Sequence, residues 1–450
     1  MANQGERLPT GRLIAHSAMS LPIMGAQMPL VTYLPVIYAK QFGISLAVMG
    51  AIFLGERIWS TLADPLVGWL CDRTSSRFGR HKVWIASGSA LFALAYVFLF
   101  FPVVAMTPFK MTAALALLFL AWSMIVVPYY AWSGELSSDY HERTRITTYQ
   151  TVTVSISLMV VLAAPAIVEN LRPGDQMLQL NAMGAAVVLP MIPATLLMLW
   201  SFPDSKQAPK VAQSDRMTLR QMWSAVAGEA VLIRIMLADF FILFAQGVRG
   251  SLFIFVVGYV LGRPDIAASL FLFQFVFGIA AAPIWQAISR WIGKHKAFLW
   301  AEAVQSAINF SLVLLSSGGF GLFLAVALLQ GLTQGAGNTI LRSMLADVAD
   351  EYRLRTGSDR TATLFSLFSI SGKAGSAVPL GLVLPLIAWF GFDPQAAQQP
   401  PSATMALALT FALGPAITHL FALLLVRRFS IDETRQVEIR RQLETQERGT

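Results

Sequence analysis

Long apolar runs separated by short polar connections dominate the hydrophobicity pattern of this chain. A run of about 18 or more apolar residues crosses a hydrocarbon core about 30 Å thick as an α-helix. Barrel strands would instead alternate apolar and polar residues, so helices are the expected spans. The pattern predicts twelve spans, at about residues 14–39, 44–71, 83–104, 109–135, 145–169, 180–202, 230–261, 265–291, 297–317, 320–347, 361–391 and 402–426.

Composition agrees with a membrane protein. Only 13% of the 450 residues are charged, 56% are hydrophobic, and the mean hydropathy is +0.61. A soluble chain would carry about 25% charged residues. The single cysteine, Cys71, excludes a disulfide within the chain and a cysteine metal cluster. The polar N-terminus predicts no cleavable signal peptide.

Basic residues are distributed unevenly between the two sides of the predicted spans. Most of the 33 Lys and Arg fall in the two tails, the central connection and the even-numbered connections. The other connections hold only Lys40, Lys110, Arg172 and Arg263. Because cytoplasmic loops are enriched in Lys and Arg, we expect a multi-pass protein of the inner (cytoplasmic) membrane with both termini in the cytoplasm. The net charge of +8 then reflects topology, and no nucleic-acid partner is expected.

The longest polar connection divides the chain into two sets of six spans. The expected organisation is a cytoplasmic N-tail at 1–13, an N-terminal six-helix bundle at 14–202, a cytoplasmic central loop at 203–229, a C-terminal six-helix bundle at 230–427 and a cytoplasmic C-tail at 428–450.

The two halves carry similar motifs at corresponding positions. The chain reads DPLVGWLCDRTSSRFGRHKVW after the second span and APIWQAISRWIGKHKAFLW after the eighth, and both end in Gly-basic-His-Lys. Likewise GELSSDYHERTR follows the fourth span and ADVADEYRLRTGSDR follows the tenth. Such a parallel repeat is the arrangement of the major facilitator transporters, whose substrate site lies at the midplane between the halves. The expected fold class is therefore an all-α polytopic membrane protein with twelve transmembrane helices around a central cavity.

Three separated motifs narrow this further: ERIWSTLADPLVGWLCDRTSSRFGRHKVWI, VPYYAWSGELSSDYHERTR and LADVADEYRLRTGSDRTATLFSLFSISGKAGSA. Together they resemble the glycoside–pentoside–hexuronide:cation symporter family, of which the melibiose permeases are members. The resemblance covers most of the chain. It implies secondary active transport of a sugar or glycoside with a coupling cation, and a small-molecule substrate as the principal partner.

An acidic residue inside the second span is the main candidate for cation coupling. Asp64 lies about eight residues, or roughly 12 Å, inside the cytoplasmic end, where an ionised carboxylate is costly without a partner or a cavity. Arg57, Ser60, Thr61 and Asp64 share one helical face. The resembling family has two cation-binding aspartates here; Asp64 matches the second and Ser60 stands at the first. The alternative is a purely structural ion pair of Asp64 with Arg57.

The coupling site of the fourth span also departs from the permeases. Val126 stands where they carry an aspartate, and Ser123 remains as a hydroxyl ligand. A single buried carboxylate suits a proton because desolvation raises its pKa, so H⁺ is favoured over Na⁺, with both open. Glu56 is a second group that could titrate. The predicted cation-coupling set is Asp64, Ser60, Thr61 and Ser123.

Polar residues within the spans predict the substrate contacts. A lysine at the position of Lys373 couples charge near the cavity in the resembling family, and small residues around it permit close helix approach. The carboxylates and arginine of a galactoside site are absent, and the remaining set is more cationic than acidic. An anionic sugar such as a uronide is therefore favoured, with a lysolipid-like or other amphipathic solute as the alternative. The predicted contacts are Arg57, Tyr130, Gln150, Asp239, Gln246, Arg249 and Lys373.

Charged residues at the cytoplasmic span ends predict a gate that locks the halves in one state. The alternative is topology anchoring with helix capping. The predicted gate residues are Asp72, Arg80, Glu135, Arg143 and Asp347.

Catalytic motifs do not appear in the chain. The five histidines are dispersed, and there is no His-Glu-x-x-His, P-loop or Gly-x-Ser-x-Gly sequence. We expect no enzyme activity, no cofactor other than the coupling ion, no metal cluster, and a monomer. A transport-inactive sensor or scaffold is a minor alternative.

Overall fold

A computed structural model describes residues 7–137, 140–204, 229–357, 361–396, 398–429, 431 and 433–449. This described part is helical, with turns and loops between the helices. It forms two compact units. Unit 1 comprises helices α1 to α8, with Arg263–Leu272 and Asp393–Gln398; unit 2 comprises α10 and the helices after it, except for the start of α11, Ala267–Leu272. Most of the predicted central loop, residues 205–228, lies outside the described residues.

Unit 1 begins with a long, interrupted first span. Helices α1 (Thr10–Ser17) and α2 (Ser20–Met28) lead through a π-helical turn, Pro29–Tyr33, into α3 (Leu34–Phe42). The proline-rich sequence explains the interruptions, because each proline lacks an N–H for the helical ladder. The remaining helices of unit 1 are α4 (Leu46–Arg73), α5 (Arg80–Phe100), α6 (Pro108–Glu135), α7 (Tyr140–Leu171) and α8 (Gln176–Ser201).

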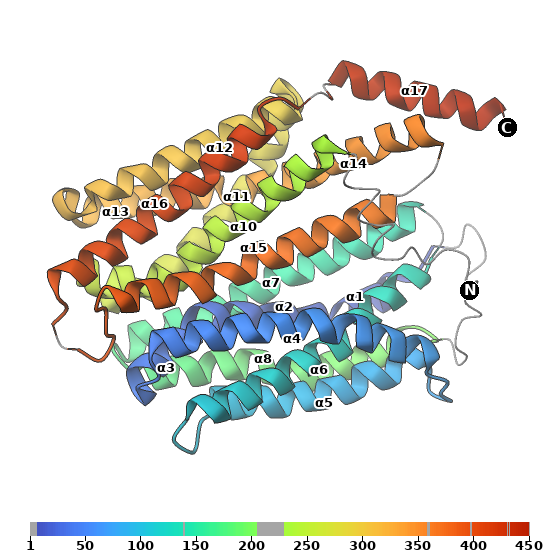
Figure 1. Cartoon of the computed structure of the whole chain (residues 1–450). Helices are drawn as coiled ribbons and strands as arrows, with labels where there is room; N and C mark the ends of the chain where they lie inside the picture. Colours follow the sequence, from blue (N-terminus) through green and yellow to red (C-terminus); the bar gives the residue numbers. More distant parts are fainter. Residues whose placement is uncertain are drawn as a thin grey trace. The chain divides into compact units, whose positions relative to one another are not determined.

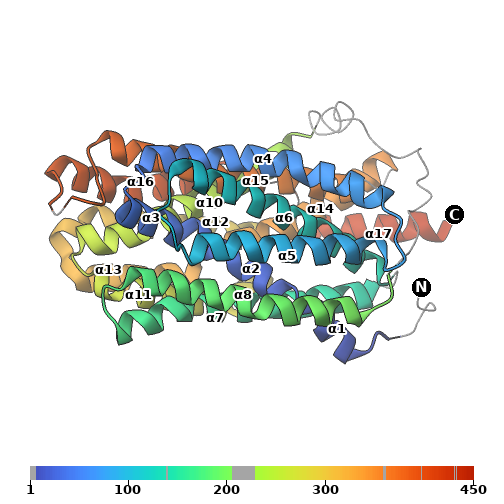
Figure 2. The same ribbon diagram turned by 90° about the horizontal axis from the view of Figure 1, so that it is seen from below.

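Within unit 1, α5 packs against α6 and α8, α4 packs against α6, and α2 packs against α7 and α8 (Figures 1 and 2). Small residues permit the close approaches. A Cβ atom at Gly88 of α5 would lie 2.9 Å from the Ile125 and Met124 side chains of α6. Large apolar side chains such as Phe92, Tyr96 and Trp132 are buried in the core of this unit.

Unit 2 contains the counterparts of these helices. They are α10 (Ala230–Phe255) with a π-helical end at Val256–Val260, α11 (Ala267–Ile292), α12 (Lys294–Ser311), α13 (Leu315–Thr333), α14 (Ala336–Thr356), α15 (Thr361–Trp389), α16 (Pro401–Val426) and α17 (Glu433–Gly449). Helix α10 packs against α15 and α16, and α12 packs against α16, α14 and α13 (Figure 1).

The small-residue segment around Lys373 lets α15 approach α10 closely, as expected. A Cβ atom at Gly375 would lie 2.5 Å from the carbonyl oxygen of Phe240, and one at Gly372 would lie 2.9 Å from Asp239 Oδ2. Only glycine leaves room for these contacts, so this stretch fixes the α10–α15 packing.

The structure describes ten helical segments that are long and apolar enough to cross a membrane. The residues predicted as the ninth and tenth spans, 297–317 and 320–347, are helical but do not meet that description. Helix α12 carries Glu302, Gln305 and Asn309 in the interior of unit 2, which lowers its hydropathy. The tenth predicted span is divided between α13 and α14, because Gly335 adopts a left-handed conformation at φ +82°. Twelve spans therefore remain a prediction.

Helix α17 shows how the predicted C-tail is placed. Ile431, Ile439 and Leu443 are buried in the same apolar core as residues of α10, α12 and α14. Arg435 lies 3.4 Å from Glu351 of α14. The amphipathic C-terminal helix is thus a packed part of unit 2.

Candidate functional site

Asp64 and Ser123 are the two predicted coupling residues that the structure joins directly. Ser45 caps the start of α4, where its hydroxyl accepts a hydrogen bond from the Val48 N–H, and the helix continues through Pro65. Asp64 lies in its C-terminal half and is half-buried. The Ser123 hydroxyl of α6 donates a hydrogen bond of 2.5 Å to Asp64 Oδ1. A carboxylate is thereby held against a hydroxyl between two packed helices of unit 1.

The other predicted residues of this helical face have different partners. The Thr61 hydroxyl donates to the carbonyl oxygen of Arg57, at 2.7 Å, and Ser60 is half-buried. The Arg57 guanidinium lies 3.8 Å from Glu56 Oε2 and 5.9 Å from the Phe119 ring centroid. These contacts give Arg57 a carboxylate partner on its own helix.

Glu56 is a buried acid that the sequence analysis noted but did not include in the coupling set. It is 6% exposed, and its Oε1 atom has no hydrogen-bond partner among the described residues. A buried acceptor without a donor is costly, so this atom is available to a proton or cation.

The predicted substrate contacts of α10 lie in the interior of unit 2. Asp239 is buried beside Gly372 of α15. The positive charge of Arg342 stabilises the Asp239 carboxylate electrostatically. Gln246 accepts a hydrogen bond of 3.4 Å from Asn338. Lys373 follows Gly372 on α15 and is exposed.

Arg249 is enclosed by polar and aromatic groups of its own unit. Its Nη1 donates to Asn309 Oδ1 at 2.9 Å, and its guanidinium lies 4.9 Å from the Phe411 ring centroid. Gln330 also donates to Asn309, at 3.4 Å. The alternative to a cavity-lining role for the polar residues of this span is pairing inside the helix bundle, and these contacts of Arg249 fit that alternative more closely than an open substrate site.

Gln150 belongs to a buried polar network in unit 1. Its amide donates to the Ser133 hydroxyl at 2.9 Å, and His16 Nε2 lies 2.9 Å from the same oxygen. The His16 ring stacks on Tyr129, with centroids 5.1 Å apart. Tyr130, the predicted aromatic contact, is 47% exposed and lies beside Tyr129. His16 and Ser133 were not predicted as site residues; in the sequence each is a polar residue inside an apolar run.

The predicted gate residues form ion pairs within single units. Arg80 pairs with Glu135, and its Nη1 lies 3.9 Å from Asp72 Oδ1; all three residues belong to unit 1. Asp347 pairs with Lys294 at 2.7 Å in unit 2 and accepts a hydrogen bond of 2.6 Å from Gln436 of α17. The Arg143 side chain lies outside the described residues. A role in locking the two halves stays a prediction.

The two Gly-basic-His-Lys motifs adopt matching structures. Each glycine has positive φ, +107° at Gly79 and +84° at Gly293, and each precedes a helix. The next basic residue pairs with an acid, Arg80 with Glu135 and Lys294 with Asp347. The two motifs therefore form equivalent ion pairs in the two units, as an internal repeat requires.

Asp204 provides a long-range cap for α5, which the sequence analysis did not anticipate. Gly79 at the N-cap position has no side chain, and the backbone N–H groups of His81 and Lys82 donate to Asp204 Oδ2 at 2.8 and 3.0 Å. The other oxygen, Oδ1, lies 2.7 Å from His81 Nδ1. Burial raises the pKa of the Asp204 carboxyl, but the hydrogen bonds from His81 and Lys82 outweigh it and hold the pKa below its ordinary value of 3.8.

The substitution Asp204→Asn is expected to lower the free energy of unfolding by about 1–2 kcal/mol at pH 7. Since the folded-state pKa lies below the unfolded one, the stabilisation is present above about pH 4 and is lost as the pH falls through the folded-state pKa. Thermal unfolding in detergent between pH 7 and pH 3 measures this. Asp72→Asn, which alters a half-exposed acid, is the control. A stability difference that persists at the lowest pH contradicts the prediction.

Unit 2 contains a buried contact between an acid and a histidine that was not predicted from the sequence. Glu302 of α12 and His419 of α16 are 1% and 4% exposed, and Oε2 lies 2.7 Å from Nδ1. Gly337 of α14 lies against the other oxygen, where a Cβ atom would collide with Glu302. The pair thus joins three helices of unit 2.

Comparison with known proteins supports the picture from the helices and motifs. The family model described as "MFS/sugar transport protein" matches residues 15–433. The putative glycoside/cation symporter YagG of Escherichia coli is 25% identical over 90% of this chain and 88% of its own length. The human sodium-dependent lysophosphatidylcholine symporter 1 is 25% identical over 87% of this chain and 78% of its own.

A solved structure shares the fold. The nucleoside transporter NupG superposes with a TM-score of 0.62 at 12% sequence identity, covering 94% of this chain and 100% of that one. At this identity the likeness concerns the fold alone.

Proposed function

The chain belongs to the MFS/sugar transport protein family, and from this we propose that it is a cation-coupled symporter of a sugar or glycoside that works by alternating access. The family and its symporter relatives place it among multi-pass membrane transporters of small molecules. The further proposals concern the coupling ion, the substrate class and the residues that serve them.

The hydrogen bond between Asp64 and Ser123 carries the proposal for coupling. It holds a carboxylate between two membrane-spanning helices, where an ionisable group is expected to be functional. Binding a cation at Asp64 would neutralise this charge, and the neutral site then tolerates a conformational change that moves it to the other face. Ser60 and Thr61 supply further oxygen atoms on the same helix.

We propose H⁺ as the coupling ion in preference to Na⁺. Sodium needs several oxygen ligands, whereas a proton needs one acceptor. Asp64 stands here with a serine at position 60 and a valine at position 126, so the negative charge near it is reduced relative to the resembling permeases. The unpartnered Oε1 of Glu56 offers a second protonation point on α4.

We propose an anionic sugar, such as a uronide, as the substrate class. Outside the packed surroundings of Arg249, the charged candidate contacts are two cations, Arg57 and Lys373, and one acid, Asp239, and guanidinium groups suit carboxylates. The gate role of Asp72, Arg80, Glu135, Arg143 and Asp347, a monomeric state, and termini in the cytoplasm belong to the same proposal.

A lysolipid-like solute is the second candidate. The observation that favours it is the human relative, whose name gives lysophosphatidylcholine as its solute and sodium as its requirement. This reading predicts transport of an amphipathic solute with a Na⁺ requirement.

Proton flux in proteoliposomes separates these proposals. Uronides, neutral glycosides and lysolipids are added in turn, with and without Na⁺, while external pH is followed. External alkalinisation with uronides alone, independent of Na⁺, is the expected result. A response restricted to lysolipids and dependent on Na⁺ would replace the proposal by the second candidate, and uptake of every class without ion flux would exclude symport.

A further inference from the structure

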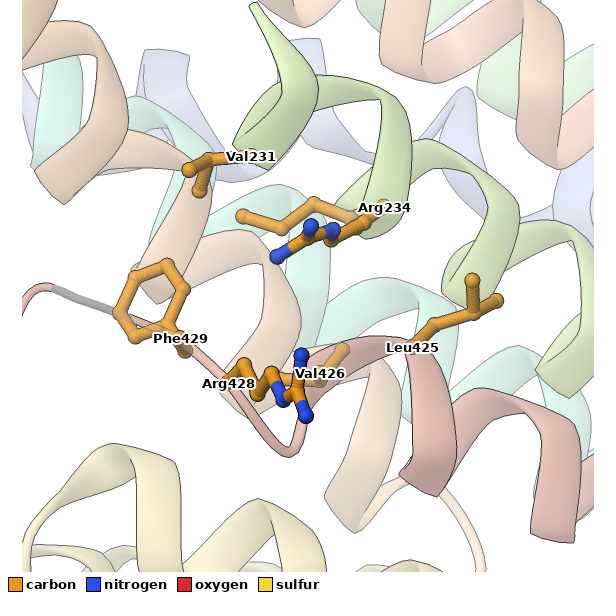
Figure 3. Close-up of a pocket in the computed structure, with 7 residues that line it drawn as sticks. Val231, Arg234, Leu425, Val426, Arg428 and Phe429 are labelled. Carbon is orange, nitrogen blue, oxygen red and sulfur yellow. The ribbon is translucent and has the colours of Figure 1, made fainter.

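A shallow surface pocket lies at the end of unit 2 where α10 begins and α16 ends (Figure 3). Figure 3 shows side chains from α10 and from the turn after α16 reaching into the same space. The lining residues are Val231, Arg234, Ile235, Leu425, Val426, Arg428 and Phe429. Two cationic groups thus lie above an otherwise apolar wall.

The two arginines of this pocket differ from the paired arginines nearby. At the same end of unit 2, Arg355 pairs with Glu229, and Arg435 pairs with Glu351. Arg234 and Arg428 have no carboxylate within 4 Å in the part of the chain that the structure describes. Both positive charges are therefore available to an anion.

The turn that carries Arg428 is held in place by several contacts. His295 Nε2 lies 3.0 Å from the Val426 carbonyl oxygen, and its ring lies 5.9 Å from that of Phe429. The Phe429 N–H donates to the same carbonyl at 2.9 Å. These contacts fix the conformation of the turn, so the Arg428 charge lies at a defined position beside the pocket.

Apolar side chains continue from the pocket along both helices. Leu237 lies one turn after Arg234 on α10, so these two residues share a helical face. Leu424 and Phe421 lie in the last two turns of α16, just before the turn that carries Arg428. All three apolar side chains are exposed. Phe241 and Phe421 stack across the α10–α16 contact, with centroids 5.4 Å apart.

We propose that this pocket binds the phosphate headgroup of an anionic phospholipid, whose acyl chains lie along the exposed apolar faces of α10 and α16. Arginine forks suit phosphate oxygens, and basic pockets between helices at the cytoplasmic ends of spans are a known form of headgroup site. The apolar wall favours a lipid over a free anion. This site is separate from the transport residues and does not depend on the transported solute.

Native mass spectrometry of the purified full chain tests the proposal, with phosphatidylglycerol as the probe and phosphatidylcholine as the neutral comparison. The double variant Arg234→Gln/Arg428→Gln is expected to weaken phosphatidylglycerol binding about 25-fold, about fivefold for each charge. Arg427→Gln is the matched control, because Arg427 is exposed beside the pocket and does not line it. It should bind within about twofold of the parent chain.

Three results would overturn the proposal. They are unchanged phosphatidylglycerol binding in the double variant, an equal loss in Arg427→Gln, and displacement of the lipid by millimolar inorganic phosphate, which would indicate a soluble anion. The double variant is checked by gel filtration. If it aggregates, the two single variants and Arg234→Lys/Arg428→Lys carry the test, since lysine keeps the charge but not the fork.

Discussion

Replacement of Asp64 by asparagine is expected to abolish accumulation of the solute against its gradient while exchange between equal concentrations continues. Asparagine keeps the size of the side chain and its contact with Ser123, but it cannot take up a proton. One proton carried with a singly charged anion moves no net charge, so the pH gradient is the driving force; a gradient equivalent to about 100 mV, or about 2.3 kcal/mol, supports about 50-fold accumulation with one proton per solute. The variant should fall to simple equilibration, measured as uptake into proteoliposomes.

Counterflow in the same vesicles is the companion measurement, because it requires the conformational cycle but no ion gradient. Asp175→Asn is the control variant: Asp175 caps α8 by accepting from the Leu178 N–H, and its charge lies far along the chain from α4. Loss of both activities in Asp64→Asn would indicate a structural role, and retention of both would exclude Asp64 as the coupling group.

Removal of His419 is expected to produce the largest loss of stability in unit 2. His419→Leu leaves Glu302 buried without its partner, and breaking a buried pair in this way costs about 3–5 kcal/mol. Replacing both residues by apolar ones, as in Glu302→Met/His419→Leu, should recover about half of this or more, because no unpaired polar group remains. Unfolding in detergent titrations measures both variants.

His295→Leu supplies the comparison, because its imidazole contacts a carbonyl oxygen and not an acid. We expect a loss of about 1 kcal/mol there. Equal stability of the single and double variants at Glu302 and His419 would show that the pair contributes only packing.

Features that depend on local sequence were predictable. The apolar runs located the helices of unit 1 and, in unit 2, the helices α10, α11, α15 and α16. The repeated Gly-basic-His-Lys motif predicted two equivalent helix starts, which the structure has. Each of these inferences uses residues that are close in sequence or related by repetition.

Features that depend on distant pairs were not predictable from one sequence. Asp204 reaches the start of α5 across more than a hundred residues, and Glu302 meets His419 across a similar separation. Neither pair has a spacing that marks it. Arg249 was predicted to line the cavity because helical periodicity places it on the same face of the helix as other polar residues. Periodicity does not show which residues of other helices lie beside it, so its contact with Asn309 could not be predicted.

Both ends of the chain are tied to their units, which limits how the protein can be handled. The Leu8 N–H donates to Glu142, and Arg145 bonds the Leu8 carbonyl, so the chain is pinned from its eighth residue. At the other end, Gln436 shares Asp347 with Lys294, while Ile439 is buried. A truncated protein that ends near Arg428 would lack α17, which covers part of the apolar core of unit 2. An affinity tag or fluorescent reporter should be attached so that α17 (Glu433–Gly449) stays intact.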